Sequence, residues 1–210
     1  MLLRKEHIAD GGLLGIKKIT DNRDALLQKL SARQREEAQM HISKMGSERR
    51  IAEWLTTRVL LAEMVDRELS IGNNSLGKPF IKNDPINISI SHTRDYVAIL
   101  LNEKFQVGVD IETISDRIFK IKDRFVSDNE FIAPDNSTIH LLLHWSAKET
   151  LFKLLDEEEV DFKEHLQVQH FTPLQKGTFE AYESKTKNRK TYRINYEVFP
   201  DAVLTWAIDK

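Results

Sequence analysis

Hydrophobic residues recur at regular spacing along most of the chain, and this spacing predicts both strands and helices. Residues 14–20 alternate between apolar and polar positions like a short strand, and residues 24–44 are charged and helical in composition. Over residues 47–69, apolar side chains recur in steps of three and four, which predicts one long amphipathic helix. The rest of this half is predicted as turns at 72–74 and 77–79 and two adjacent strands, 86–91 and 96–101, joined through 92–95.

The second half of the chain repeats this order of elements. Alternation predicts a strand over residues 106–113, followed by helical stretches near 115–123 and a long helix over 138–156. Four further alternating runs are predicted as strands: 166–171, 177–183, 190–198 and 202–208. Each half therefore reads as a strand, helices and a small antiparallel sheet, and we predict the α+β class.

Two short matches indicate an internal repeat. Residues 14–20 align with 107–113, and residues 53–61 align with 144–152, at nearly equal offsets of 93 and 91 residues. Matches in the same order at similar offsets favour a duplicated unit of about 100 residues. We therefore predict two similar halves, residues 1–105 and 106–210.

The same alignment separates the chemistry of the halves. Lys17 stands in the first half where Asp110 stands in the second, and Arg58 stands where Glu149 does. Carboxylates that could bind a metal are thus replaced by cations in the first half. We expect one active site per chain rather than two.

Composition narrows the functional classes. The 210 residues carry 31 Lys and Arg against 33 Asp and Glu, a formal net charge of −2, and 40% of them are hydrophobic. This balance is typical of a globular chain and argues against bulk nucleic-acid binding. The absence of cysteine excludes Cys-ligated zinc, iron–sulfur clusters and a thiol nucleophile. Early charges leave no signal-peptide core, and the longest apolar run, 96–101, is too short to span a membrane, so we expect a cytoplasmic protein.

The first candidate for chemistry is Gly108-Val109-Asp110-Ile111-Glu112. On a strand, Asp110 and Glu112 share one face with Gly108, which leaves room for a ligand. Hard cations such as Mg²⁺ bind carboxylate oxygens. A solvated acidic strand face would show the same pattern, so these residues alone leave both interpretations open.

The second candidate lies on the long predicted helix of the second half. Glu149 and Lys153 are four residues apart, away from the apolar stripe, and Lys148 precedes Glu149. On pattern alone, an exposed ion pair is the more common arrangement. Trp145 and Phe152 flank these charges and indicate partial burial, in which case Glu149 could complete a metal site while the lysines hold phosphate oxygens.

The third candidate combines a turn with the end of a strand. Lys78 lies in Gly77-Lys78-Pro79, and Ser91 and His92 end the predicted strand 86–91. Backbone amides, hydroxyls, an imidazole and a lysine suit an anion such as phosphate, and Arg50 on the preceding helix could join them. A turn lysine and an exposed histidine are also common without any function.

In chain order, these motifs resemble those of the 4′-phosphopantetheinyl transferases. The resemblance rests on Gly77-Lys78-Pro79, Ser89-x-Ser91-His92-Thr93, Gly108-Val109-Asp110-Ile111-Glu112 and Trp145-x-x-Lys148-Glu149-Thr150-x-x-Lys153. The motifs cover residues 77–153, and the third and fourth at this separation are specific. Length and duplicated layout are similar to the two-half type typified by the surfactin-synthetase activator.

The resemblance implies a fold and a reaction. Members are single chains of two similar α+β halves with the active site in the cleft between them, here a monomer with pseudo-twofold symmetry. They transfer the 4′-phosphopantetheine group of coenzyme A to a serine of an apo acyl or peptidyl carrier protein. The reaction needs Mg²⁺, with Mn²⁺ as a possible substitute, and releases 3′,5′-adenosine bisphosphate.

The resemblance also implies roles for individual residues. The metal ligands would be Asp110, Glu112 and Glu149, and either Glu149 or a metal-bound water would take the proton of the attacking serine. Lys148 and Lys153 would hold the diphosphate and the leaving group. The nucleotide contacts would be Lys78, Ser91, His92 and Arg50.

A basic segment follows the acidic strand and suits a protein partner. Residues 117–125 alternate basic residues with Ile118, Phe119, Ile121 and Phe125. In the resembling family, this region helps dock the carrier protein, which is usually acidic, and an apolar contact with a positive rim would fit it. An ordinary amphipathic surface helix is an equal alternative.

Two other functions remain open from the sequence. Asp-x-Glu with a Lys-Glu pair also occurs in metal-dependent phosphodiesterases and nucleases, although the near-zero net charge and the lack of a basic stripe argue against a nuclease. A non-catalytic module that binds coenzyme A or a carrier protein is the other alternative. The three carboxylates beside lysines argue against it.

Overall fold

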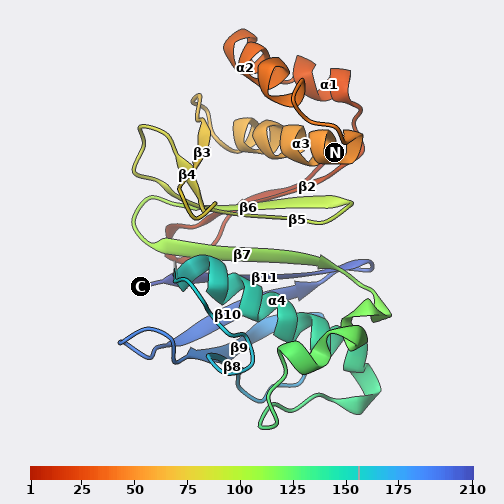
Figure 1. Ribbon diagram of the computed structural model, residues 1–210, viewed down its shortest axis with the longest axis vertical. Coiled ribbons are helices and arrows are strands. Elements are labelled where there is room, and N and C mark those ends of the chain that lie inside the picture. Colours follow the sequence, from red (N-terminus) through yellow and green to blue (C-terminus); the bar gives the residue numbers. More distant parts are fainter. Residues whose placement is uncertain (156) are drawn as a thin grey trace. The chain divides into compact units, whose positions relative to one another are not determined.

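The computed structural model describes residues 1–155 and 157–210 (Figure 1). The chain divides into two compact units, an N-terminal unit Met1–Lys104 and a C-terminal unit Phe105–Lys210. Each combines α-helices with antiparallel sheet, so the predicted α+β class is confirmed. Among the described residues, no helix has the length and apolar character needed to cross a membrane.

The N-terminal unit is built on a four-stranded antiparallel sheet of order β1-β2-β6-β5. Its strands are β1 (Leu2–His7), β2 (Leu13–Lys18), β5 (Asn87–His92) and β6 (Tyr96–Asn102). The last three are the predicted strands. β1, which a short 3₁₀ turn at Ala9–Gly11 joins to β2, was not predicted, because four of its six side chains are polar and most are exposed at the sheet edge.

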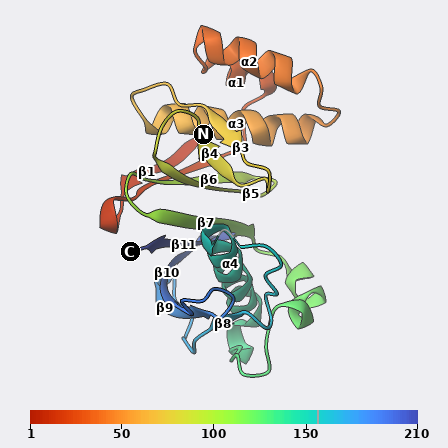
Figure 2. The same cartoon turned by 60° about the vertical axis from the view of Figure 1, so that its left-hand side comes forward.

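The helices of this unit are α1 (Arg23–Gln28), α2 (Ala32–Ile42) and α3 (Glu48–Met64). α3 packs on β2 and β6, and α1 packs on α3 (Figure 2). The predicted helical stretch 24–44 is thus two helices, because Ser31 begins α2 with a capping box that includes Gln34. α3 ends at Met64 instead of residue 69, since Val65 is already extended.

A two-stranded ribbon of β3 (Ile71–Asn73) and β4 (Pro79–Ile81) follows α3. The predicted turns 72–74 and 77–79 therefore lie partly in these two strands, and the turn itself covers residues 74–78. Asn74 shapes this turn, because its side chain accepts hydrogen bonds from the backbone of Leu76 and Lys78. Gly77 has φ +84°, a conformation that side chains disfavour.

The C-terminal unit is built on a five-stranded antiparallel sheet of order β7-β11-β10-β9-β8. Its strands are β7 (Gln106–Thr113), β8 (Leu166–Val168), β9 (Lys176–Glu183), β10 (Thr191–Val198) and β11 (Ala202–Asp209). All five correspond to predicted runs. β8 is shorter than its run, 166–171.

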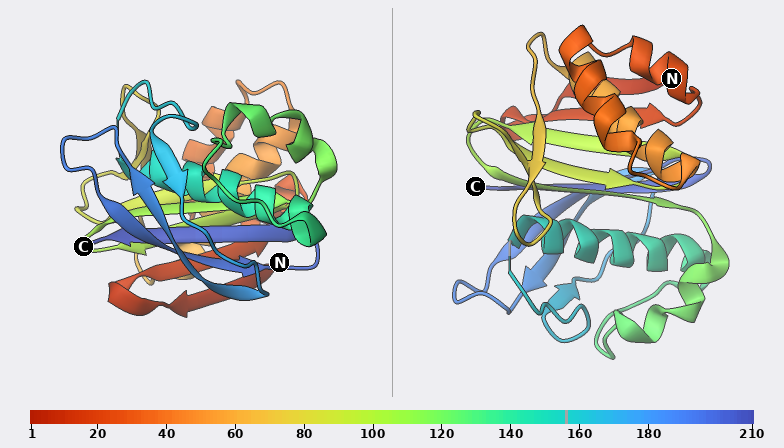
Figure 3. Two further views of the ribbon diagram at one scale, coloured as in Figure 1. Left: turned by 90° about the horizontal axis from the view of Figure 1, so that it is seen from below. Right: turned by 45° about the horizontal axis from the view of Figure 1, so that its top comes forward.

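One long helix, α4 (Ser137–Leu155), crosses the face of this sheet and packs mainly on β7 and β11 (Figure 3). The predicted end of this helix at residue 156 lies outside the described residues. The stretch 115–123 forms 3₁₀ turns at Asp116–Lys120 and Lys122–Arg124, and another at Pro134–Asn136 leads into α4. The core between α4 and the sheet includes Leu143, Ala147 and Leu151, none of which is exposed.

Candidate functional site

Gly108 brings β7 unusually close to α4. A Cβ atom at this position would overlap the backbone carbonyl oxygen of Thr150, so only glycine allows the strand and the helix to lie this near. The Thr150 hydroxyl bonds the Thr205 hydroxyl at 2.7 Å, which ties α4 to β11 as well. Because of this close approach, Asp110 and Glu112, which follow Gly108 by two and four residues on β7, face side chains of α4.

Asp110 and Glu112 each contact a side chain of α4. The Lys153 ammonium donates to Asp110 Oδ1 at 2.6 Å and to the backbone oxygen of Val109 at 3.1 Å. The Trp145 indole N–H donates to Glu112 Oε1 at 2.7 Å. The helix therefore provides one positive and one neutral donor to the two carboxylates of the strand.

Burial and mutual repulsion raise the pKa values of two glutamates in this acidic cluster. Burial raises the pKa of Glu149 to about 7, and the nearby Asp110 adds to the shift, while Lys153 opposes it. Burial also raises the pKa of Glu112 to about 7, again with a contribution from Asp110, although the Trp145 hydrogen bond acts in the other direction. A bound cation would favour the ionised form of both glutamates.

The donor chemistry fits a hard divalent cation, but these side chains do not form a closed cage. Within the described parts of the chain, no three His, Asp or Glu side chains converge closely enough to enclose a metal ion. Asp110 is held by Lys153, and Glu112 is held by Trp145. Mg²⁺ commonly binds only one or two protein carboxylates and takes further oxygens from water and substrate phosphates.

Lys148 lies elsewhere, in the core of the C-terminal unit. Its side chain is fully buried, and its ammonium donates to Glu130 Oε2 at 2.8 Å and to the backbone oxygens of Phe125 and Phe162. Glu130 also accepts the backbone N–H groups of Ser127 and Val168. Lys148 and Glu130 therefore join α4 to two loops and to β8.

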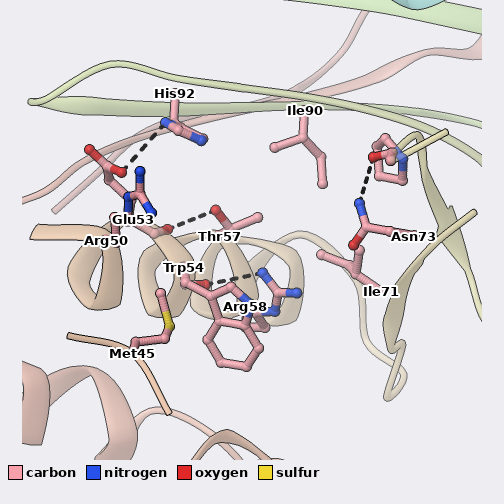
Figure 4. A pocket seen from close by; sticks show the side chains of 12 residues that line it. Met45, Arg50, Glu53, Trp54, Thr57, Arg58, Ile71, Asn73, Ile90 and His92 are labelled. Atoms are coloured by element: carbon pink, nitrogen blue, oxygen red, sulfur yellow. Dashed lines mark hydrogen bonds and ion pairs between the residues drawn. The ribbon is translucent and has the colours of Figure 1, made fainter. Parts of the chain in front are cut away.

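A cavity of about 420 Å³ opens in the N-terminal unit between α3, the β3–β4 ribbon and the end of β5 (Figure 4). Arg50 and His92, both predicted nucleotide contacts, line it, together with Gly77 and Pro79 on either side of Lys78. Lys78 is half-buried, and Ser91, the residue before His92, is buried. Two of the four predicted anion-binding residues thus line this cavity, and the other two are chain neighbours of lining residues.

Trp54 and Arg58 form the floor of this cavity and also line an adjoining one of about 740 Å³. The Arg58 guanidinium lies 3.7 Å from the centre of the Trp54 ring, and the His41 imidazole stacks on the same indole at 4.4 Å. These two groups must occupy opposite faces of the ring. Burial lowers the pKa of Arg58 to about 10, so it remains a cation at neutral pH.

Comparison with known proteins finds a family match for the C-terminal unit. Residues 106–207, which span β7, α4 and nearly all of β11, match the family model described as the 4′-phosphopantetheinyl transferase superfamily. Residues 106–207 belong to the 4′-phosphopantetheinyl transferase superfamily. This is an enzyme family, and the resemblance inferred from the motifs is confirmed.

Curated phosphopantetheinyl transferases are similar over longer stretches. The chain is 33% identical over 115 residues to the 4′-phosphopantetheinyl transferase gsp of Aneurinibacillus migulanus, which covers 47% of this chain and 48% of that protein. It is 29% identical over 134 residues to the 4′-phosphopantetheinyl transferase AcpT of Salmonella typhi, which covers 59% of this chain and 68% of AcpT. The match to AcpT of Escherichia coli K12 is 28% over 110 residues, or 48% of this chain and 55% of that relative. The chain thus matches about half the length of gsp and about two thirds of the Salmonella AcpT.

Several residues of the C-terminal unit have roles that the sequence did not indicate. Glu130 is the buried partner of Lys148, and the sequence gave no sign of it, because 18 residues separate the two. In the basic segment 117–125, Ile118 and Phe125 are buried in the core, so the prediction that they form an apolar contact surface is wrong. Phe119 is 40% exposed and is available for such a contact.

Proposed function

We propose that this protein transfers the 4′-phosphopantetheine group of coenzyme A to a serine of an apo carrier protein. One observation supports this most: Gly108 brings the carboxylates of β7 against Glu149 and Lys153 of α4, within the region that matches the transferase family. The result is an anionic cluster with a lysine at its edge. Such a cluster suits a hard cation together with the diphosphate of a nucleotide substrate.

The proposed reaction exchanges one phosphorus–oxygen bond for another. The carrier serine oxygen attacks the β-phosphorus of coenzyme A and loses its proton. The bond from this phosphorus to the bridging oxygen breaks, and 3′,5′-adenosine bisphosphate leaves with the bond electrons. Glu149, or a water on the metal, would accept the serine proton, and the Glu149 pKa of about 7 suits a general base at neutral pH.

Other residues of the C-terminal unit would bind and orient the reactants. Asp110, Glu112 and Glu149 would hold Mg²⁺, or Mn²⁺ in its place, and this ion would neutralise the charge of the diphosphate. Lys153 lies beside Asp110 and can move its ammonium to the departing bisphosphate oxygens. We assign Lys148 a structural role instead of the diphosphate contact implied by the resemblance, because its ammonium already has three partners in the core.

The N-terminal unit would supply the nucleotide contacts. Arg50 and His92 line its cavity, and Lys78 and Ser91 are adjacent to lining residues, so all four can serve the adenosine and its 3′-phosphate. A ligand with several phosphates needs a locally basic site, even in a chain of net charge −2. The acceptor carrier would contact Phe119 and the basic residues around it.

The duplication of the two units is also part of this proposal. Each has a glycine on a strand that faces a helix, Gly15 against Met64 of α3 and Gly108 against Thr150 of α4. These glycines are the ones aligned by the internal repeat. A shared ancestry of both units explains why a similar close approach recurs with different charges around it.

The decisive experiment measures transfer directly. Purified protein is incubated with coenzyme A, Mg²⁺ and separate apo carriers of the fatty-acid, peptidyl and aryl types, and each carrier is then weighed by mass spectrometry. We expect at least one carrier to gain the phosphopantetheine mass, and a carrier with its acceptor serine changed to alanine to gain none. No mass gain with any carrier would refute the proposed function.

A further inference from the structure

Glu53 is a buried carboxylate in the cavity of the N-terminal unit. It lies on α3, is only 6% exposed, and lines the cavity together with Arg50 and His92 (Figure 4). The other charged or titratable side chains that line this cavity are Arg50, Arg58 and His92, so a negative group is unexpected among them, because it would repel a phosphate. Its presence therefore calls for a role of its own.

Both oxygens of this carboxylate face positive or potentially positive groups. Glu53 Oε1 accepts a hydrogen bond from Arg49 Nε at 2.8 Å. Glu53 Oε2 lies 3.8 Å from His92 Nδ1, which is an ion-pair distance longer than a hydrogen bond. The Arg49 side chain is 68% exposed, whereas that of Glu53 is 8% exposed, so the carboxylate is fixed between a surface cation and the imidazole.

The position of Glu53 determines how His92 is presented. A carboxylate beside one ring nitrogen favours the proton on that nitrogen and fixes the ring orientation, as acidic partners do for histidines at many functional sites. With Nδ1 directed to Glu53, Nε2 is left as the nitrogen for a ligand. The ring edge that carries Nε2 is then the one that an anion in the cavity would meet.

We infer that Glu53 is a positioning residue that orients the His92 imidazole and stabilises its positive charge when a phosphate monoester binds in this cavity. The inference rests on the proposed function, which supplies that monoester as the 3′-phosphate of coenzyme A. Two effects oppose each other here: direct repulsion between Glu53 and the phosphate, and the support that Glu53 gives to His92. Because Arg49 already offsets the carboxylate charge, we expect the support to dominate.

The sign of one substitution tests this balance. Glu53→Gln keeps the size of the side chain and removes its charge. We expect it to weaken binding of 3′,5′-adenosine bisphosphate about tenfold, the loss typical of one charge-assisted contact, and to leave binding of 5′-AMP, which lacks the 3′-phosphate, nearly unchanged. Calorimetric titration of the full chain gives both affinities, and the ¹⁵N shifts of the His92 ring show whether the proton leaves Nδ1.

Two further variants complete the design. Glu36→Gln removes the same charge from an exposed position of α2 and should change neither affinity. Arg49→Gln alters an exposed side chain and loosens Glu53, so a smaller loss that is again confined to the bisphosphate is expected, even if Glu53→Gln does not fold. Equal or tighter binding of the bisphosphate by Glu53→Gln, or an equal loss for both nucleotides, would overturn the inference.

The transfer assay separates this inference from the proposed function. If the wild-type protein loads a carrier but Glu53→Gln binds the bisphosphate normally, only the role of Glu53 is refuted. If the wild-type protein neither loads any carrier nor binds the bisphosphate, the proposed function and this inference fail together.

Discussion

Each unit has a strand–helix contact that pairs a lysine with an acidic residue, and the two contacts place these groups in reversed order. The contact lies between β2 and α3 in the N-terminal unit and between β7 and α4 in the C-terminal unit. In the first, Lys17 of the strand bonds both oxygens of Glu63 on the helix, at 2.8 and 2.7 Å. In the second, Asp110 of the strand bonds Lys153 of the helix at 2.6 Å. Each contact is made beside a glycine that faces the helix.

The two contacts differ in net charge. Lys17 and Glu63 neutralise one another, and Lys17 is only 1% exposed, so the pair is a structural one. Around Asp110, acidic side chains outnumber cations. Glu112 and Glu149 lie near Asp110, whose ion-pair partner is Lys153, and both glutamates have raised pKa values. An excess of one charge, rather than the close packing itself, is what distinguishes a candidate metal site from a structural contact.

The largest expected effect is on transfer activity, which should depend on the contact of the C-terminal unit and not on that of the N-terminal unit. Asp110→Asn should lower phosphopantetheine transfer by about a thousandfold or more, because several interactions with the metal and the diphosphate depend on this carboxylate. Glu63→Gln, its counterpart at the N-terminal contact, should retain transfer. Steady-state kinetics with circular dichroism as a folding control measures both. Equal losses in the two variants would show that the charge difference has no functional meaning.

Two ion pairs that each contain a buried lysine should differ in their contribution to stability. Glu130→Gln leaves Lys148 as a buried cation without its counter-charge, and we expect the free energy of unfolding to fall by about 3–5 kcal/mol. Glu63→Gln should cost less, about 1–3 kcal/mol, because the Glu63 side chain is 29% exposed and water can partly replace it. Urea denaturation monitored by tryptophan fluorescence gives both values, and a reversed order would contradict this prediction.

The two glycines provide a third test. Gly108→Ala forces a methyl group onto a backbone oxygen of α4, which cannot move aside without shifting the helix, and should cost about 3 kcal/mol or more. Gly15→Ala meets only the flexible side chain of Met64, so about 1 kcal/mol is expected. Thermal denaturation of both variants provides the comparison. If Gly15→Ala is the more damaging, rigid backbone contact is not what Gly108 secures.

The smallest expected effect concerns pH. Burial lowers the pKa of His140 to about 4 and that of His144 to about 3, so in the folded C-terminal unit both stay neutral while the unfolded chain binds protons below pH 6.5. Their contribution to stability is therefore complete above pH 6.5 and is lost as the pH falls, by up to about 1.4 kcal/mol per pH unit for each histidine.

Substitution isolates this contribution from other titrating groups. His144→Phe should flatten the difference in unfolding free energy between pH 7 and pH 5, measured by urea denaturation at each pH. His41→Phe in the N-terminal unit serves as the control and should change this slope much less, because His41 is exposed. Identical slopes for wild type and His144→Phe would refute the buried, neutral state of His144.

Much of the fold follows from local pattern. Alternation located β2, β5, β7 and the strands of the C-terminal sheet, because half-buried strands place apolar side chains on one face, whereas β6 was located as a continuous apolar run. The failures arise where local pattern carries little information. β1 is a charged edge strand, and the break between α1 and α2 depends on the capping box at Ser31.

The candidate site divides in the same way. The motifs around Asp110 and Glu149 were readable from residue type and spacing alone, and they led to the transferase family that the comparison confirmed. The roles of Lys148 and Glu53 were not readable. Lys148 belongs to a motif whose charge suggested a phosphate contact, yet its partners come from the loops at Phe125, Glu130 and Phe162.

The sequence by itself therefore determined which residue types are present, on which kind of element each lies, and which family their spacing resembles. Only the tertiary structure decided which charges are paired, because a charge is compensated by whichever groups the fold brings within a few ångströms, at any distance along the chain. Lys17 and Asp110 illustrate this difference. Both were visible as charged strand residues, but Glu63 neutralises the first, while the second stands among acids that leave the cluster with an excess of negative charge.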